Sequence, residues 1–319
     1  MWRLVIGFTV AAHVLTAQTP VTLTITNGRW FDGTTFVART AVVAGNVLSF
    51  RPVEPPPAPD TTTIDLKGGH VIPPFEAESA ADVDAKWTRV VSSRPSIVKA
   101  FLQYSEEYEA RRGDPKFFGN RGLSPEAFRR VVALAHRDQL RVAAHVASAQ
   151  DFSVAVRAGA DVIAHLPGYL SPETIAPADA KLAAAKKIVL IPTASLARGL
   201  ARGAGVLERV QTAQRENLRL LKQEGVALAI GSDSWSDTSH QEVEYLRTLN
   251  VFDDLDLLRM WTENCAATVF PGRKIGRLVD GAEADFLVLD SNPLVDFAAT
   301  RRILQRVKNG QVLPPPETK

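Results

Sequence analysis

Three polar residues directly follow short apolar runs in this chain, and they constrain its fold more than any other feature. They are His145 in RVAAHVA, His165 in DVIAHLPG and Asp233 in ALAIGSDS, and each precedes a helical or loop segment. In a parallel α/β barrel the carboxyl ends of the strands face one common site. Imidazole and carboxylate groups that converge there are typical of a catalytic Zn²⁺ centre. The sequence therefore predicts a barrel with a metal site at that face.

The composition is ordinary for a soluble globular enzyme, with 45% hydrophobic and 23% charged residues among 319. The net charge of +2 gives no indication of a nucleic-acid partner or of binding to an anionic membrane surface. Cys265 is the single cysteine, so an internal disulfide is impossible. The length is sufficient for one large domain, or for one large and one small domain.

Residues 1–17 read as a secretory signal peptide. Arg3 supplies a positive charge, Leu4–Leu15 is apolar, and small residues around Ala17 offer a cleavage point. The stretch is too short for a comfortable membrane span. The alternative is a buried first strand, but the next run, VTLTITNG, already serves as one. We therefore expect an exported protein, periplasmic or secreted, with no membrane span after the signal is removed.

Both ends of the chain are rich in short predicted strands separated by turn residues. These strands cover Val21–Ile25, Arg29–Phe31, Thr40–Val43, Val47–Phe50, Ala284–Leu289, Ile303–Val307 and Gln311–Leu313. The pair Asn27-Gly28 predicts a turn, and Asn309-Gly310 predicts a type I′ hairpin. We expect residues 18–70 and 275–319 to form one small composite β-sandwich.

The middle of the chain, 71–274, alternates apolar runs with amphipathic helices and predicts a (β/α)8-type barrel. The apolar runs are Val71–Phe75, Ile97–Leu102, Val142–Val146, Val162–His165, Ile188–Pro192 and Val226–Gly231. These about six strands fall short of the eight that a barrel needs, and the span is shorter than the roughly 250 residues of a typical barrel. The deficit falls between Phe75 and Ile97, where a single helical stretch, Ala80–Val91, joins two strands. We expect an incomplete barrel.

The predicted site has the chemistry of a metal-dependent hydrolase. Neutral imidazoles of His145 and His165 would be ligands, and Asp233 would be a proton-accepting base or a further ligand. A bound Zn²⁺ or similar ion would lower the pKa of its water toward neutrality. For each histidine alone, a hydrogen-bonded core residue is the ordinary alternative. Three such residues at strand ends favour the functional interpretation.

Lys99, in SIVKAFL, is the fourth candidate. With a pKa of about 10.4 its amine could not bind a metal, but carboxylation by CO₂ would convert it into a carbamate that can. The alternative is a strand-end lysine that reaches solvent or pairs with Glu106 or Glu107, and the chemistry alone leaves both open. Tyr104 could line a substrate pocket, and His240 could touch substrate or be a surface histidine.

These residues stand in a pattern that resembles the amidohydrolase superfamily, in its imidazolonepropionase-like or prolidase-like branch. The resemblance rests on SIVKAFL, on the stretch 122–168, on GVALAIGSDSW and on the tail KIGRLVDGAEADFLVLDSNPLVDF. It implies a barrel with a β-sandwich built from both chain ends. It also implies that Lys99 matches a carboxylated, metal-bridging lysine, that His145 and His165 match metal ligands, and that Asp233 matches a ligand and proton shuttle.

One part of the family pattern is absent from this sequence. In the family, a segment like GGHVIPPF continues into an H-x-H pair that holds one metal, whereas here it continues into EAESAADVDAKW. Neither Glu76 nor Glu78 is a histidine. The resemblance thus implies one metal rather than two. An incomplete barrel also leaves unpaired strand edges, which favour a homo-oligomer.

Two hypotheses follow. The first is an exported, metal-dependent hydrolase that uses metal-activated water to cleave carbon–nitrogen bonds in small amides, cyclic amides or dipeptides, with Asp233 transferring the proton. The second is a catalytically inactive, truncated relative that acts as a binding scaffold or is a degenerate product. The two differ in whether the chain binds a metal through His145.

Overall fold

The structure is a computed structural model, and it describes most of the chain. The described residues are 22–31, 36–44, 47–51, 62–67, 70–71, 79–117, 120–234 and 238–314. The chain divides into two compact units, 1–76 and 77–319. The predicted signal peptide, 1–17, lies outside the described residues and stays a prediction. Within the described part, no helix is long and apolar enough to span a lipid bilayer.

The first unit contains one mixed sheet. Its strands are β1 (Thr22–Phe31), β2 (Phe36–Ala44), β3 (Val47–Arg51), β4 (Thr62–Asp65) and β5 (His70–Val71). β2 pairs antiparallel with β1 and β3, while β4 and β5 pair parallel with β1. The predicted turn at Asn27-Gly28 is wrong, because β1 continues through it and only shifts register between Ile25 and Gly28. A single extra residue in a strand produces such a bulge without ending the strand.

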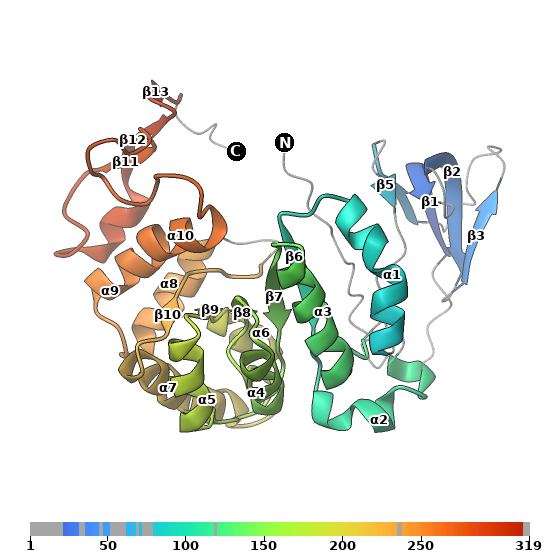
Figure 1. Cartoon of the computed structure of the whole chain (residues 1–319). Coiled ribbons are helices and arrows are strands. Elements are labelled where there is room, and N and C mark those ends of the chain that lie inside the picture. Colours follow the sequence, from blue (N-terminus) through green and yellow to red (C-terminus); the bar gives the residue numbers. More distant parts are fainter. Residues whose placement is uncertain are drawn as a thin grey trace. The chain divides into compact units, whose positions relative to one another are not determined.

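The second unit is built on a five-stranded parallel sheet, shown with its flanking helices in Figure 1. In spatial order the strands are β10 (Ala227–Leu228), β9 (Val189–Ile191), β8 (Val162–Ala164), β7 (Arg141–His145) and β6 (Ile97–Phe101). Sequential strands are neighbours, as in a barrel. Within the described residues, β6 and β10 each pair on one side only. The predicted incomplete (β/α)8-type barrel is confirmed.

The first of the predicted barrel strands, Val71–Phe75, does not begin in the parallel sheet. Its described part is Val71, which with His70 forms β5 and pairs with Arg29 and Trp30 of β1. His70 and Val71 therefore add a strand to the sheet of the first unit, and residues 72–75 lie outside the described part of the chain. The apolar run is too short for its sequence to decide between two sheets.

One helix leads into the parallel sheet, and further helices connect its strands. They are α1 (Ala80–Ser92), α2 (Tyr108–Arg111), α3 (Pro125–Arg137), α4 (Ala149–Ala158), α5 (Pro177–Ala185), α6 (Ala197–Leu200) and α7 (Val206–Gln223). α3 begins after Ser124, whose hydroxyl caps the helix by accepting a hydrogen bond from the Ala127 amide at 3.1 Å. α4 ends at Gly159, whose φ of 88° only glycine adopts easily. After β10 come α8 (Ser239–Thr248), α9 (Asp254–Arg259), a π-helical turn (Met260–Asn264) and α10 (Cys265–Val269).

The core of the second unit lies between the outer face of the parallel sheet and these helices. Alternate residues of β7 are buried there, Val142 and Ala144, because successive side chains of a strand point to opposite faces. Phe128 of α3 and Phe152 of α4 are buried in the same cluster. This packing fixes the strands, and with them the residues that follow each strand.

The chain ends in a small antiparallel sheet of β11 (Phe286–Leu289), β12 (Ile303–Lys308) and β13 (Gln311–Val312). The predicted hairpin is confirmed: Asn309 and Gly310 have φ values of 50° and 74°, the left-handed conformation that a type I′ turn requires. The composite sandwich with the N-terminal strands stays a prediction.

Candidate active site

The first candidate residues lie on the inner face of the incomplete barrel. β6 and β7 pair in parallel, with Lys99 opposite Ala143 and Phe101 opposite His145. These side chains share one face, since residues two apart in a strand point the same way. Phe101 is 40% exposed, although the interior of a closed barrel is packed with side chains. The incomplete sheet therefore leaves this face open to water.

The structure brings together the three residues that the sequence singled out. The imidazole rings of His145 and His165 lie with their centroids 4.4 Å apart. Nε2 of His165 is 3.9 Å from Oδ2 of Asp233, whose side chain is 63% exposed. His165 itself is buried. Two imidazoles and a carboxylate thus gather at the carboxyl ends of β7, β8 and β10.

Two neighbouring side chains orient the histidines. The Thr193 hydroxyl lies 2.7 Å from Nδ1 of His165, so Nε2 is the atom presented to Asp233. Oε1 of Gln103 lies 2.9 Å from Nε2 of His145. Because a carbonyl oxygen only accepts, Nε2 of neutral His145 donates this bond and Nδ1 keeps the lone pair. Hydrogen bonds of this kind fix ring orientation and tautomer at metal sites.

Both histidines are held in the neutral form. Burial lowers the pKa of His145 to about 3, and the nearby Lys99 charge adds to the shift. Burial also holds the pKa of His165 well below its usual value, again with contributions from His145 and Lys99. Neutral imidazole keeps the nitrogen lone pair that a metal or a proton needs.

Lys99 faces the same open space. Its Nζ lies 5.6 Å from the centroid of the Phe101 ring. Burial lowers its pKa to about 8, and the Asp233 charge partly opposes this shift. The Lys99 side chain nevertheless keeps contact with water, so the shift carries little free energy. Glu106, one of the partners considered for Lys99, instead accepts a hydrogen bond from the Ser148 hydroxyl at 2.9 Å.

The backbone is strained at four of the strand ends that surround the site. Tyr104, His165, Thr193 and Asp233 have φ values of 48°, 78°, 45° and 49°. Side chains other than glycine rarely adopt this left-handed conformation, and a β-branched residue such as Thr193 adopts it least. Such strain persists only where surrounding contacts fix it, and it is concentrated at functional sites.

Asp151 supplies contacts that hold two of the loops at the site. This fully buried carboxylate accepts hydrogen bonds from the backbone amides of Tyr104 and Ser105 at 2.9 and 2.8 Å. It also accepts from the amides of Ala147 and Ser148 at 3.0 and 3.2 Å. The loop after β6 and the loop after β7 are therefore joined through one side chain.

Glu242 of α8 has the same role after β9. Its carboxylate is fully buried and accepts from the amides of Ala194 and Ser195 at 2.7 and 2.8 Å. These residues directly follow Thr193, the residue that orients His165. Burial raises the pKa of Glu242 to about 7, although the hydrogen bonds from Ser195 and Ala194 oppose the shift.

This raised pKa makes the stability of the fold depend on pH, and Glu242→Gln should remove that dependence. Glu242 binds a proton in the folded chain up to about pH 7 but in the unfolded chain only up to about pH 4.5. The protonated Glu242 side chain stabilises the fold fully below about pH 4.5, and this stabilisation is lost as the pH rises through about 7. The free energy of unfolding should fall by about 3 kcal/mol over this pH range. Urea unfolding at the two ends of this range measures it.

We expect the free energy of unfolding of wild type, minus that of Glu242→Gln, to fall by about 3 kcal/mol between about pH 4.5 and about pH 7.5. Glu244→Gln is the matched control, because Glu244 lies on the same helix but is half exposed and paired with Arg301. It should not show this fall. A difference for Glu242→Gln that stays constant with pH would disprove the assignment.

The lower-ranked candidates occupy different places. Burial raises the pKa of the Tyr104 phenol to about 12, with the Glu173 charge adding to the shift. His240 lies on α8, where its ring packs edge-on against Trp261 and Nε2 contacts the Thr300 carbonyl at 3.2 Å. Neither contact of His240 reaches the paired histidines.

Sequence reasoning missed three residues that shape the site: Gln103, Thr193 and Tyr169. The Tyr169 ring lies 5.7 Å from that of His165, and burial raises the pKa of its phenol. Gln103 and Thr193 both follow an apolar strand closely, which is the same positional signal that selected His165. That signal could have found them.

The side chains of this cluster carry donor atoms that a metal ion can bind. His145, His165 and Asp233 supply the nitrogen and oxygen atoms that Zn²⁺ binds, and both imidazoles are neutral. In the part of the chain that the structure describes, no three His, Cys, Asp or Glu side chains lie close enough together to hold a metal ion as they stand.

Comparison with known proteins shows which family and which folds this chain resembles. The model of the Amidohydrolase family matches residues 89–313. Comparison with curated proteins gives no significant match. Among solved structures, the ochratoxinase of A. niger is 19% identical with a TM-score of 0.59, over 83% of this chain and 59% of the ochratoxinase.

Two further structures resemble the chain over most of their length. A prolidase candidate from Bifidobacterium longum is 20% identical with a TM-score of 0.53, covering 94% of this chain and 96% of that protein. A Xaa-Pro dipeptidase with bound methionine is 15% identical with a TM-score of 0.50, covering 92% and 99%. At these identities the similarity shows a shared fold.

Proposed function

The chain belongs to the amidohydrolase family, and from this premise we propose that it is a hydrolase of carbon–nitrogen bonds in small amides, cyclic amides or dipeptides. The proposed activity depends on a single zinc-like ion. The observation that carries the proposal is the cluster of His145, His165 and Asp233, with the two rings 4.4 Å apart and the carboxylate 3.9 Å from His165.

Each residue has a role that its surroundings support. His145 and His165 would hold the ion, since both rings are neutral. One ring nitrogen of each is hydrogen-bonded, to Gln103 and to Thr193 respectively, and this bond orients the ring. A bound ion of this type supplies Lewis acidity and a water molecule of lowered pKa. Partial desolvation raises the pKa of the half-exposed Asp233 carboxylate, although the Lys99 charge opposes the shift. The shift moves this carboxylate toward the range where it can accept a proton and then donate it.

Lys99 has two roles within this proposal. As a carbamate formed with CO₂, it would add an oxygen ligand to the ion. As the free ammonium, it would neutralise the Asp233 carboxylate, with which it interacts electrostatically. A pKa of about 8 leaves part of the amine unprotonated near neutral pH, which is the form that reacts with CO₂.

Three further features belong to the proposal. The sequence of residues 1–17 supports export to the periplasm or the medium. Among the described residues one side of β6 and one side of β10 pair with no strand, which supports a homo-oligomer because open strand edges associate readily. The net charge of +2 supports a small-molecule substrate over a nucleic acid.

Hydrolysis by the full chain, purified with Zn²⁺ and bicarbonate, tests the proposal. We expect cleavage within a panel of dipeptides, including Xaa-Pro, and N-acyl amino acids. His145→Ala and Asp233→Asn should each lower kcat/KM by about 100-fold or more. Asp253→Asn is the matched control, since Asp253 caps α9 and asparagine caps a helix equally well. Equal rates in wild type and His145→Ala would contradict the proposal.

A second candidate function is an inactive binding scaffold. It is favoured by the lack of three converging ligands among the described residues and by the open inner face at Phe101. This candidate predicts no turnover of any amide in the panel, with or without Zn²⁺. It also predicts that His145→Ala leaves binding of small molecules unchanged.

A further inference from the structure

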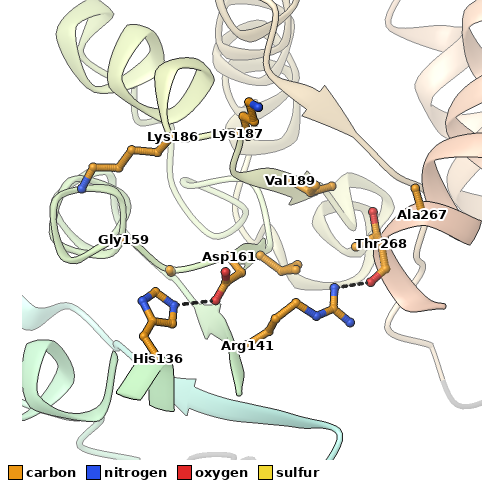
Figure 2. Close-up of a pocket in the computed structure, with 11 residues that line it drawn as sticks. His136, Arg141, Gly159, Asp161, Lys186, Lys187, Val189, Ala267 and Thr268 are labelled. Atoms are coloured by element: carbon orange, nitrogen blue, oxygen red, sulfur yellow. Dashed lines mark hydrogen bonds and ion pairs between the residues drawn. The ribbon is translucent and has the colours of Figure 1, made fainter. Parts of the chain in front are cut away.

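A cavity lies at the opposite end of the parallel sheet from the paired histidines. It has a volume of about 510 Å³, and its lining includes Arg141, Asp161, Lys186, Lys187, Val189 and Ala267. Arg141 begins β7, whereas His145 ends it. The cavity, whose lining residues are drawn in Figure 2, therefore belongs to the amino ends of β7, β8 and β9 and to α10. None of the residues of the proposed hydrolase site lines it. Its size suits a small organic molecule.

Positive charge dominates the lining. Arg141, Lys186 and Lys187 carry three cationic groups, and Asp161 is the one carboxylate among the lining residues. The Asp161 carboxylate is already engaged, because its Oδ2 accepts from the Val142 amide at 2.7 Å and lies 2.9 Å from Nε2 of His136. The field inside the cavity therefore favours an anion.

Arg141 is positioned to bind that anion. Its Nη1 donates to the carbonyl of Thr268 at 2.6 Å, which holds the guanidinium against α10 (Figure 2). Its other N–H groups, on Nε and Nη2, make no hydrogen bond to any residue that the structure describes. A fixed guanidinium with free donors is well suited to a phosphate or carboxylate, because its planar fork can form paired hydrogen bonds.

The two lysines add charge and differ in their contacts. Nζ of Lys186 donates to the Arg157 carbonyl at 2.9 Å, so its charge is held beside the cavity. Lys187 makes no ion pair with any acidic side chain in the described part of the chain, and its backbone φ of 57° marks a tight turn into β9. Val189 and Ala267 supply apolar surface between these polar groups.

We propose that this cavity binds a small organic phosphate. The phosphate group accepts hydrogen bonds from the free N–H groups of Arg141, within the field of Lys186 and Lys187. The organic part packs against Val189 and Ala267. A doubly charged phosphate is favoured over a carboxylate because it gains more from three cationic groups that share one carboxylate neighbour.

Titration calorimetry with phenyl phosphate on the full chain tests this site. Wild type should bind it, and Arg141→Gln should weaken the affinity by about tenfold or more, as expected for the loss of charge-assisted hydrogen bonds. Lys187→Gln should weaken it a few-fold by removing one charge. Lys181→Gln is the matched control, because Lys181 is exposed on α5 outside the cavity, and it should bind as wild type does.

Several results would overturn the proposal. They are no binding of phenyl phosphate to wild type, unchanged affinity in Arg141→Gln, or benzoate binding as tightly as phenyl phosphate. Arg141→Gln also loses the bond to Thr268, so circular dichroism must show that it folds. If it does not fold, Lys187→Gln decides, and unchanged affinity in that variant rejects the site. Wild-type hydrolysis of the dipeptide panel is independent of all these outcomes.

Discussion

Replacing Asp151 with alanine should lower the free energy of unfolding by about 4 kcal/mol, a loss that few single substitutions cause. The Asp151 carboxylate is fully buried and accepts hydrogen bonds from four backbone amides, those of Tyr104, Ser105, Ala147 and Ser148. Alanine would leave these donors without an acceptor. Each buried, unsatisfied N–H costs about 1–3 kcal/mol, less where water enters the space. Urea unfolding followed by circular dichroism measures the loss.

A matched substitution separates this effect from ordinary helix capping. Asp253 caps α9 with a single exposed hydrogen bond to the Asp256 amide at 2.7 Å, so Asp253→Ala should cost about 1 kcal/mol. Asp151→Asn keeps one acceptor oxygen and should fall between the two alanine variants. A loss for Asp151→Ala no larger than that for Asp253→Ala would show that the loops after β6 and β7 do not depend on this carboxylate.

The same substitution should also affect the candidate site. Tyr104 is held in a left-handed conformation with φ of 48° directly beside Asp151. Gln103, the preceding residue, contacts His145. Loosening this loop should therefore release the ring of His145, which is visible as a change in its NMR chemical shifts.

Much of the fold follows from local sequence. The strand that ends in His145 and the helix that begins after Ser124 were predictable because alternation and capping are local signals. The convergence of His145, His165 and Asp233 was predictable for a different reason. Parallel strands in sequential order bring their carboxyl ends to one edge, so position along each strand was enough.

The rest depends on contacts between distant residues. Gln103 and His145 are 42 residues apart, and Ala194 and Glu242 are 48 apart, so no local pattern relates them. A charged residue on a helix normally indicates a solvated face, so the sequence offers no reason to expect that Glu242 is buried. Tertiary packing buries it completely. Val71 was predicted to begin a barrel strand but pairs in the sheet of the first unit, because short apolar runs do not specify their partners.

Loss of bound metal is the second large effect that we expect. A site with two neutral imidazoles and one carboxylate has no ligand to spare, so removing either imidazole should abolish binding at micromolar Zn²⁺. His165→Ala should be as severe as His145→Ala, because both rings face the same space. Asp253 caps α9 and is not part of this cluster, so Asp253→Asn should keep the wild-type metal content.

The most direct test is the number of Zn²⁺ ions per chain, measured by elemental analysis after purification with Zn²⁺ and bicarbonate. The shared site of His145, His165 and Asp233 predicts about one ion per chain in wild type and in Asp253→Asn, and close to none in the two histidine variants. Wild-type protein that carries no metal, or histidine variants that retain it, would contradict the claim that these residues form a metal-dependent hydrolase site.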